Sequence, residues 1–176
     1  LAWTNLGSVL AELGKAAAAD AAYDRADKIN PTVALTAINR GRNAASRGRK
    51  SEARRWYRRA VKRDPRALLG YLNLALIEFD DRRFSAARTH LKRALEIEPK
   101  FAAAYWVLGR IELEERDPRS ALLAYRKFLE LEPKQVTAYL ELALALTKAE
   151  RVGEAIELLN KGKEVIGNHP KLNAAL

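Results

Sequence analysis

The chain has 176 residues, of which 48% are hydrophobic, and a formal net charge of +10. It contains no cysteine, which excludes disulfide bridges, thiolate metal sites and cysteine nucleophiles. No apolar run approaches the roughly 18 residues that a membrane-spanning helix needs, and no signal peptide is visible. We therefore expect a cytoplasmic location, and we interpret the chain, which begins at Leu1, as a fragment of a longer protein.

Four prolines recur along the chain at a constant interval of 34 residues: Pro31, Pro65, Pro99 and Pro133. A small residue stands twelve positions before each of them, and a bulky residue stands eight positions before. A fixed period of this length is typical of repeat proteins in which stacked copies bury a shared core. We predict a single domain over 1–176 with repeats at about 1–33, 34–67, 68–101, 102–135 and 136–170, and the start of a further helix at 171–176.

Each repeat carries two apolar stripes with helical spacing. In the third repeat the first stripe includes Leu68, Leu72 and Phe79, and the second includes Phe84 and Leu91. A polar segment over 80–83 separates them. We therefore predict two helices in every repeat, with the closing proline at the joint because proline cannot continue a helix.

The fourth and fifth repeats carry signals for helix ends. Asp117 followed by Pro118 is typical of an N-cap and a first-turn proline. In the fifth repeat, Gly167 stands where proline is expected, and Pro170 follows three residues later. We expect a helix to end near Gly167.

The opening residues Trp3-Thr4-Asn5-Leu6-Gly7, with the later alanines, bulky residues and prolines, resemble the signature of the tetratricopeptide repeat. The resemblance covers the whole chain. It implies an all-α, right-handed superhelical solenoid of antiparallel helix pairs, with five repeats and the start of a sixth. It also implies that the first helix of each repeat lines a concave inner face, and that the protein acts as a protein-binding scaffold or adaptor.

The inner face, assigned by this register, is largely apolar with two arginines. We predict that it forms a groove for a peptide or helix of a partner protein, because large exposed apolar patches usually mark partner sites. Trp106 beside Arg110 is the best candidate for an anchor. The alternative is that these side chains only pack between helices. The predicted contact residues are Asn5, Ile38, Asn39, Arg42, Leu72, Asn73, Leu76, Phe79, Trp106, Arg110, Leu140 and Leu144.

Three of these residues, Asn5, Asn39 and Asn73, stand 34 residues apart. An asparagine amide can donate to and accept from one backbone peptide unit. The series is similar to the asparagine ladder of repeat proteins that bind extended peptides. The alternative is that asparagine is common at this position whatever the ligand.

The positive charge is concentrated in the second repeat. Residues 34–67 contain twelve Lys and Arg and two acids, which matches the whole net excess. On its second helix we predict a basic patch on the convex face: Arg54, Arg55, Arg58, Arg59 and Lys62. Such a patch suits an acidic protein surface, anionic membrane or nucleic acid, or is a solvated face without a ligand. Arg54 could instead pair internally with Asp20.

Nothing in the sequence points to catalysis. The two histidines, His90 and His169, lack partners at motif spacing, and no phosphate loop or metal signature is present. We expect no enzyme activity and no cofactor. A further hypothesis is self-assembly into homo-oligomers through apolar helix faces.

Overall fold

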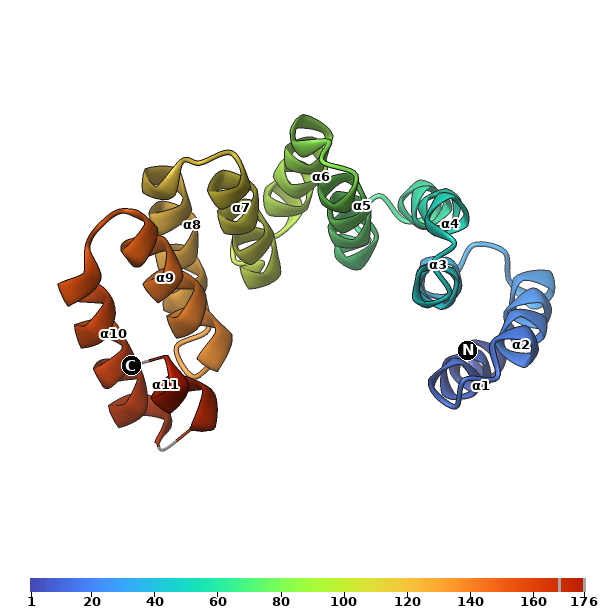
Figure 1. The fold of residues 1–176 in the computed structure, drawn as a ribbon. Coiled ribbons are helices and arrows are strands. Elements are labelled where there is room, and N and C mark those ends of the chain that lie inside the picture. Colours follow the sequence, from blue (N-terminus) through green and yellow to red (C-terminus); the bar gives the residue numbers. More distant parts are fainter. Residues whose placement is uncertain (168, 176) are drawn as a thin grey trace. The chain divides into compact units, whose positions relative to one another are not determined.

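The computed structural model describes residues 1–167 and 169–175, and within them every regular element is a helix. The chain divides into two compact units, an N-terminal unit of Leu1–Ile97 and a C-terminal unit of Glu98–Leu176. The predicted two helices per repeat are confirmed, and the boundary between the units falls at the loop that follows the third pair (Figure 1).

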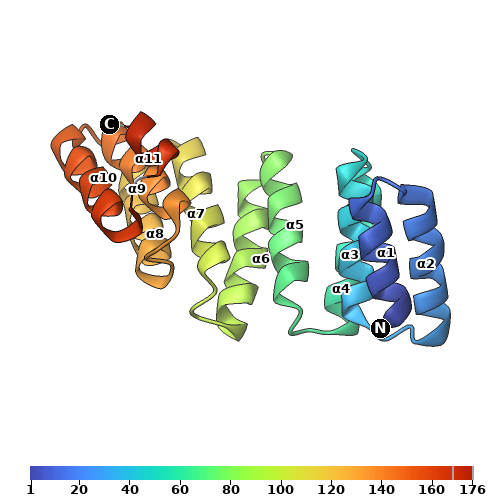
Figure 2. The ribbon, with the colours of Figure 1, turned by 90° about the horizontal axis from the view of Figure 1, so that it is seen from below.

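The N-terminal unit consists of three helix pairs: α1 (Ala2–Glu12) with α2 (Ala16–Ile29), α3 (Ala34–Ser46) with α4 (Lys50–Arg63), and α5 (Leu68–Asp80) with α6 (Phe84–Ile97). The two helices of a pair run antiparallel and side by side (Figure 2). Successive pairs pack through α2 against α3 and through α4 against α5.

The C-terminal unit contains α7 (Ala102–Glu114), α8 (Pro118–Leu131), α9 (Val136–Lys148), α10 (Val152–Ile166) and α11 (Pro170–Ala174). One continuous core, which includes Tyr125, Phe128, Leu142 and Leu159, joins these helices. The short α11, in the segment predicted to start a sixth repeat, contributes Leu172, which is fully buried in this core. It begins at Pro170, one residue before the predicted start.

A glycine facing a tyrosine explains the close contact within three of the pairs. A Cβ built on Gly7 would lie 2.4 Å from the ring of Tyr23, and a Cβ on Gly41 would lie 2.4 Å from the ring of Tyr57. Gly109 meets Tyr125 in the same way, at 2.5 Å. A side chain at these positions would overlap the ring, so the recurring glycine and the recurring bulky residue are two halves of one packing contact.

The turn inside each pair has the same backbone conformation. One residue with positive φ closes the turn in every repeat: Gly14, Gly48, Arg82, Arg116 and Glu150. The first two are glycines, which adopt this conformation without steric cost. The same backbone hydrogen bond follows in all five turns, with N···O distances of 2.8 to 3.0 Å between residues such as Lys15 and Leu10.

The predicted helix signals of the later repeats are confirmed. The Asp117 side chain accepts a hydrogen bond of 3.0 Å from the Ser120 backbone N–H, and Pro118 is the first residue of α8. Gly167 ends α10 with φ of 93°. None of the described helices is long and apolar enough to cross a membrane.

Candidate functional site

The first helices of the N-terminal unit form an open depression of about 220 Å³ on their exposed side. It lies between α1 and α3, with Tyr23 of α2 at its floor. Most of its lining residues carry a polar group, and several of these groups are hydrogen-bond donors. The lining residues are Ser8, Ala11, Glu12, Tyr23, Asn39, Arg42, Asn43 and Ser46.

Two predicted contact residues, Asn39 and Arg42, lie in this depression. Asn39 Nδ2 donates a 2.8 Å hydrogen bond to Ser8 Oγ, which holds the amide in one orientation and leaves its oxygen available. Arg42 is exposed and forms no ion pair with the described residues. Burial raises the pKa of the nearby Tyr57 to about 12, and the positive charge of Arg42 opposes this increase.

The other two members of the predicted asparagine series have free side-chain amides. Asn5 is exposed and Asn73 is half-buried, and neither donates or accepts a side-chain hydrogen bond among the described residues. Leu72 and Leu76, on either side of Asn73, are also half-buried. Leu72, Asn73 and Leu76 therefore each keep part of their side chain in contact with solvent, but a smaller part than Arg42.

The prediction that Ile38 and Phe79 line an open groove is wrong. Ile38 is 5% exposed because it packs among Ala37, Ala60 and Ala67 between α3 and its neighbours. Phe79 is 9% exposed, and its ring centroid lies 5.8 Å from that of Phe84 across the turn. Both side chains belong to the core.

The residue at the equivalent position of the first repeat, Thr4, is buried like Ile38. The Oγ1 of Thr4 lies 2.8 Å from Oγ1 of Thr36 on α3, so the two hydroxyls share a hydrogen bond. In these two repeats the position therefore serves helix packing, which is the alternative that the sequence left open for the inner-face residues.

In the C-terminal unit, Trp106 is half-buried and held from two sides. Its Nε1 donates a 3.2 Å hydrogen bond to Glu141 Oε1 on α9. The guanidinium carbon of Arg110 lies 4.9 Å from the Trp106 ring centroid, in cation–π range. The ring is thus fixed in place while part of it stays in contact with solvent.

Two further predicted residues, Leu140 and Leu144, lie on α9, the helix that carries Glu141. Leu140 is half-buried and packs on the core, whereas Leu144 is exposed. Below them, burial raises the pKa of Tyr125, and the negative charge of Glu141 raises it further. Tyr125 therefore stays neutral and acts as a packing residue.

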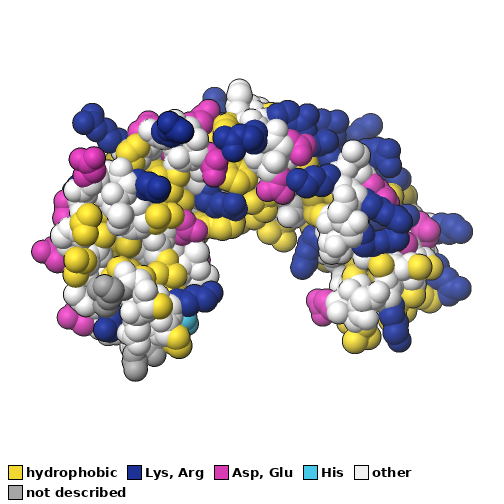
Figure 3. Space-filling view, viewed as in Figure 1, with side chains coloured by type: hydrophobic (Ala, Val, Ile, Leu, Met, Phe, Trp, Pro, Cys, Tyr) yellow, Lys and Arg dark blue, Asp and Glu magenta, His cyan; other side chains and the backbone are white. Residues whose placement is uncertain are grey.

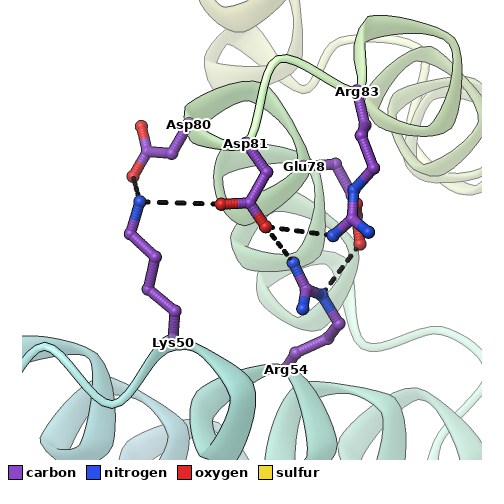
Figure 4. A network of polar contacts seen from close by, with 6 residues as sticks. All are labelled: Lys50, Arg54, Glu78, Asp80, Asp81 and Arg83. Carbon is purple, nitrogen blue, oxygen red and sulfur yellow. Dashed lines mark hydrogen bonds and ion pairs between the residues drawn. The ribbon is translucent and has the colours of Figure 1, made fainter.

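The predicted basic patch divides into one paired residue and four free ones. Arg54 is not a free convex-face residue, because its side chain is 15% exposed and its Nε lies 3.1 Å from Glu78 Oε1. It also donates to the Asp81 carboxylate. Figure 4 shows that Arg83 approaches the same two acids, while Lys50 pairs with Asp80 and Asp81.

The predicted Asp20–Arg54 bridge is also wrong. Asp20 Oδ2 pairs with Arg47 at 2.9 Å, and its Oδ1 accepts a 2.8 Å hydrogen bond from Asn43. Both partners lie on the next helix along the chain, α3 and its C-cap. Each of these joints therefore links a second helix to the following first helix, and not one second helix to another.

The four remaining residues of the patch, Arg55, Arg58, Arg59 and Lys62, are exposed on α4. Lys and Arg side chains gather on the N-terminal unit around α3 and α4 (Figure 3). Arg59 lies over the ring of Trp56, with 5.3 Å to the centroid, and Arg40 covers the same ring at 4.0 Å.

Comparison with protein families decides the family. Models described as tetratricopeptide repeat match residues 2–33 and, in overlapping segments, 38–100, 72–118 and 107–169. The chain belongs to the tetratricopeptide repeat family. A comparison with curated proteins found no match.

Solved structures of tetratricopeptide repeat proteins have the same fold. MamA is 25% identical with a TM-score of 0.76, over 90% of this chain and 92% of MamA. TTC0263, a thermophilic protein of Thermus thermophilus, is 23% identical with a TM-score of 0.75, over 98% and 94% of the two chains. YrrB, described as having an unusual peptide-binding site, is 19% identical with a TM-score of 0.70, over 98% and 89%.

Within this tetratricopeptide repeat chain, sequence reasoning missed several residues of the inner face. Ser8 and Asn43 line the depression of the N-terminal unit, and Glu141 orients Trp106. Ser8 occupies the same repeat position as Arg42, and Glu141 the same position as Asn39. Their position in the repeat therefore indicated the inner face, whereas their residue types did not suggest a contact. The described residues include no group of three or more side chains suited to hold a metal ion.

Proposed function

We propose that this protein is a non-catalytic scaffold that binds a peptide or helix of a partner protein on the exposed side of its first helices. Membership of the tetratricopeptide repeat family supports a protein-binding role at the coarse level. The finer assignment concerns two places, the depression between α1 and α3 and the surface around Trp106.

The observation that carries the proposal is the depression between α1 and α3, with Arg42 and Asn39 in its lining. Arg42 is exposed and forms no ion pair with the described residues, and Asn39 offers an oriented amide oxygen. Together they can bind the carbonyl and N–H groups of an extended backbone, or a carboxylate. Polar groups fixed before binding cost less ordering entropy when a partner arrives.

The surface around Trp106 supplies a different kind of contact. The ring is held by Glu141 and Arg110 and is partly exposed, and Leu144 on the neighbouring α9 is exposed. Tryptophan and arginine are enriched among the residues that dominate binding energy at protein interfaces. We expect this surface to hold an apolar side chain of a partner peptide.

The proposal can be tested with peptides selected by display of a random library against the intact protein. Binding of the selected peptides is then measured for Arg42→Ala and for Trp106→Ala. We expect at least one of the two variants to lose about 2 kcal/mol of binding free energy for each peptide, or roughly 30-fold in affinity. Lys92→Ala, at an exposed position of α6, serves as the control.

The control separates the inner side from the rest of the surface. Peptides that bind both inner-side variants as tightly as the original protein would show that these residues do not form the site. Circular dichroism of every variant establishes that the helices remain intact.

A further inference from the structure

We propose that the outer side of α4 is a second docking surface, which takes an acidic helical segment of a protein partner. We name the four exposed residues Arg55, Arg58, Arg59 and Lys62 the α4 basic stripe. They occupy consecutive turns of one helix face, so the stripe is continuous along α4. This surface is separate from the depression and from the surface around Trp106.

The residues of the α4 basic stripe differ from their neighbours in having no acidic partner. Arg49 pairs with Glu52, Arg54 with Glu78, and Arg63 with Asp27. In contrast, no residue of the stripe forms an ion pair among the described residues. Like charges at this spacing repel each other, so the stripe costs the isolated helix free energy that an acidic ligand would offset.

The stripe borders an open depression of about 550 Å³. Its lining consists of Pro31 and Arg63 together with three stripe residues, Arg58, Arg59 and Lys62. Arg63 is fixed at its edge, because Nη1 lies 2.8 Å from Asp27 Oδ1 and donates a 3.0 Å hydrogen bond to the Val33 carbonyl. Arg63 Nη2 is buried and has no hydrogen-bond partner among the described residues. The depression therefore combines exposed surface cations with one held in place by Asp27 and the Val33 carbonyl.

The chemistry of the stripe suits carboxylates displayed on a helix. Side chains three and four residues apart on a helix are about 5–6 Å apart, so an acidic helix matches the stripe residue by residue. Three of the four cations are arginines, whose planar fork binds a carboxylate through two parallel hydrogen bonds. Arg54, on the same helix, already binds the carboxylates of Glu78 and Asp81.

Two other anionic partners fit the surface less well. Helices that lie on membranes combine cations with exposed apolar side chains, and no large apolar side chain of α4 is exposed. Single-stranded nucleic acid requires free aromatic faces for its bases. The one half-buried aromatic residue of α4, Trp56, has Arg40 and Arg59 over its ring.

The test uses a labelled alanine-based helical peptide with Glu at every third and fourth position, and the same peptide with Gln in place of Glu. Binding to the full chain is measured by fluorescence anisotropy at several salt concentrations. The first variant is Arg55→Glu/Arg58→Glu/Arg59→Glu/Lys62→Glu. The control reverses four exposed lysines elsewhere, Lys28→Glu/Lys92→Glu/Lys134→Glu/Lys148→Glu, so that both have the same net charge.

We expect the Glu peptide to bind the original protein and the control, and to bind the α4 variant at least about tenfold more weakly. The Gln peptide should bind none of them. Equal losses in the two variants would overturn the proposal, because they would indicate attraction to net charge alone. A duplex DNA oligonucleotide, single-stranded DNA or anionic vesicle that binds the stripe more tightly than the Glu peptide would also overturn it.

Discussion

Arg54 and Asp81 reproduce, with opposite charges, the contact between Asp20 and Arg47. Each residue of the first pair lies 34 residues after its counterpart in the second, so both pairs occupy the same positions of successive joints. In the first joint the acid lies on α2 and the cation at the C-cap of α3. In the second joint the cation lies on α4 and the acid at the C-cap of α5.

The second joint should be sensitive to loss of its arginine. Arg54→Ala removes one of the two ion-pair partners recorded for Glu78, whose side chain is 4% exposed; the other is Arg83. We expect the free energy of unfolding to fall by about 1–3 kcal/mol, measured by urea denaturation followed by circular dichroism. Arg55→Ala, one residue along the helix, should change it by less than about 0.5 kcal/mol, because Arg55 is exposed and unpaired.

The stability of the N-terminal unit should depend on pH through Asp81. The hydrogen bond from Arg54 lowers the pKa of the Asp81 carboxyl below its ordinary value of 3.8. Because the folded pKa is the lower one, this contribution is present above about pH 4 and is lost as pH falls through the folded value. Urea midpoints measured at falling pH should decline less steeply in acid for Asp81→Asn.

A comparison of Asp81→Asn with the original protein over a range of pH can also contradict this prediction. The variant should be less stable than the original protein at neutral pH and approach it in strong acid, where Asp81 is protonated in both states. Parallel curves for the two proteins at every pH would show that Asp81 contributes no pH dependence.

Gly41→Ala should destabilise the protein although alanine is the better helix former. The added methyl group would overlap the ring of Tyr57, whose nearest atom is 2.4 Å from the ideal Cβ position. We expect a loss of about 1–3 kcal/mol in thermal or urea unfolding. Gly153→Ala is the matched control, since no atom lies within 4 Å of a Cβ there, and it should stabilise α10 by about 0.5 kcal/mol.

The hydroxyls of Thr4 and Thr36 should behave as a coupled pair. Either Thr4→Val or Thr36→Val leaves one buried hydroxyl without its partner, and should cost about 1–3 kcal/mol in urea unfolding. The double variant removes both polar groups and should be close to the original protein. Additive losses in the double-mutant cycle would contradict this coupling.

The helix pairs could be predicted from the sequence because their signals are local. The two stripes per repeat and the capping pair Asp117-Pro118 depend on residues close together in the chain, and the 34-residue period of the prolines marks the end of each pair. The turns were less visible. Arg82, Arg116 and Glu150 adopt the positive φ of Gly14 and Gly48, so the conformation recurs where the residue type does not.

The candidate site was only partly predictable because exposure depends on neighbouring repeats. Ile38 and Phe79 have the register of inner-face residues, yet adjacent side chains cover them. The predicted Asp20–Arg54 ion pair was wrong for a related reason. The 34-residue register shows which positions of two repeats are equivalent, but it does not show which non-equivalent positions are in contact. Arg42 is exposed and Trp106 is half-buried, so both side chains keep contact with solvent.

The two joints carry their acid and their cation on opposite helices, so the first three repeats are not interchangeable. Deleting the second repeat would place Asp20 against Asp81, two carboxylates in one joint. Duplicating it would place Arg54 of one copy against Arg47 of the next, two guanidinium groups in one joint. Either product would place like charges where the present protein has an ion pair, so its helices would stack less favourably at that joint.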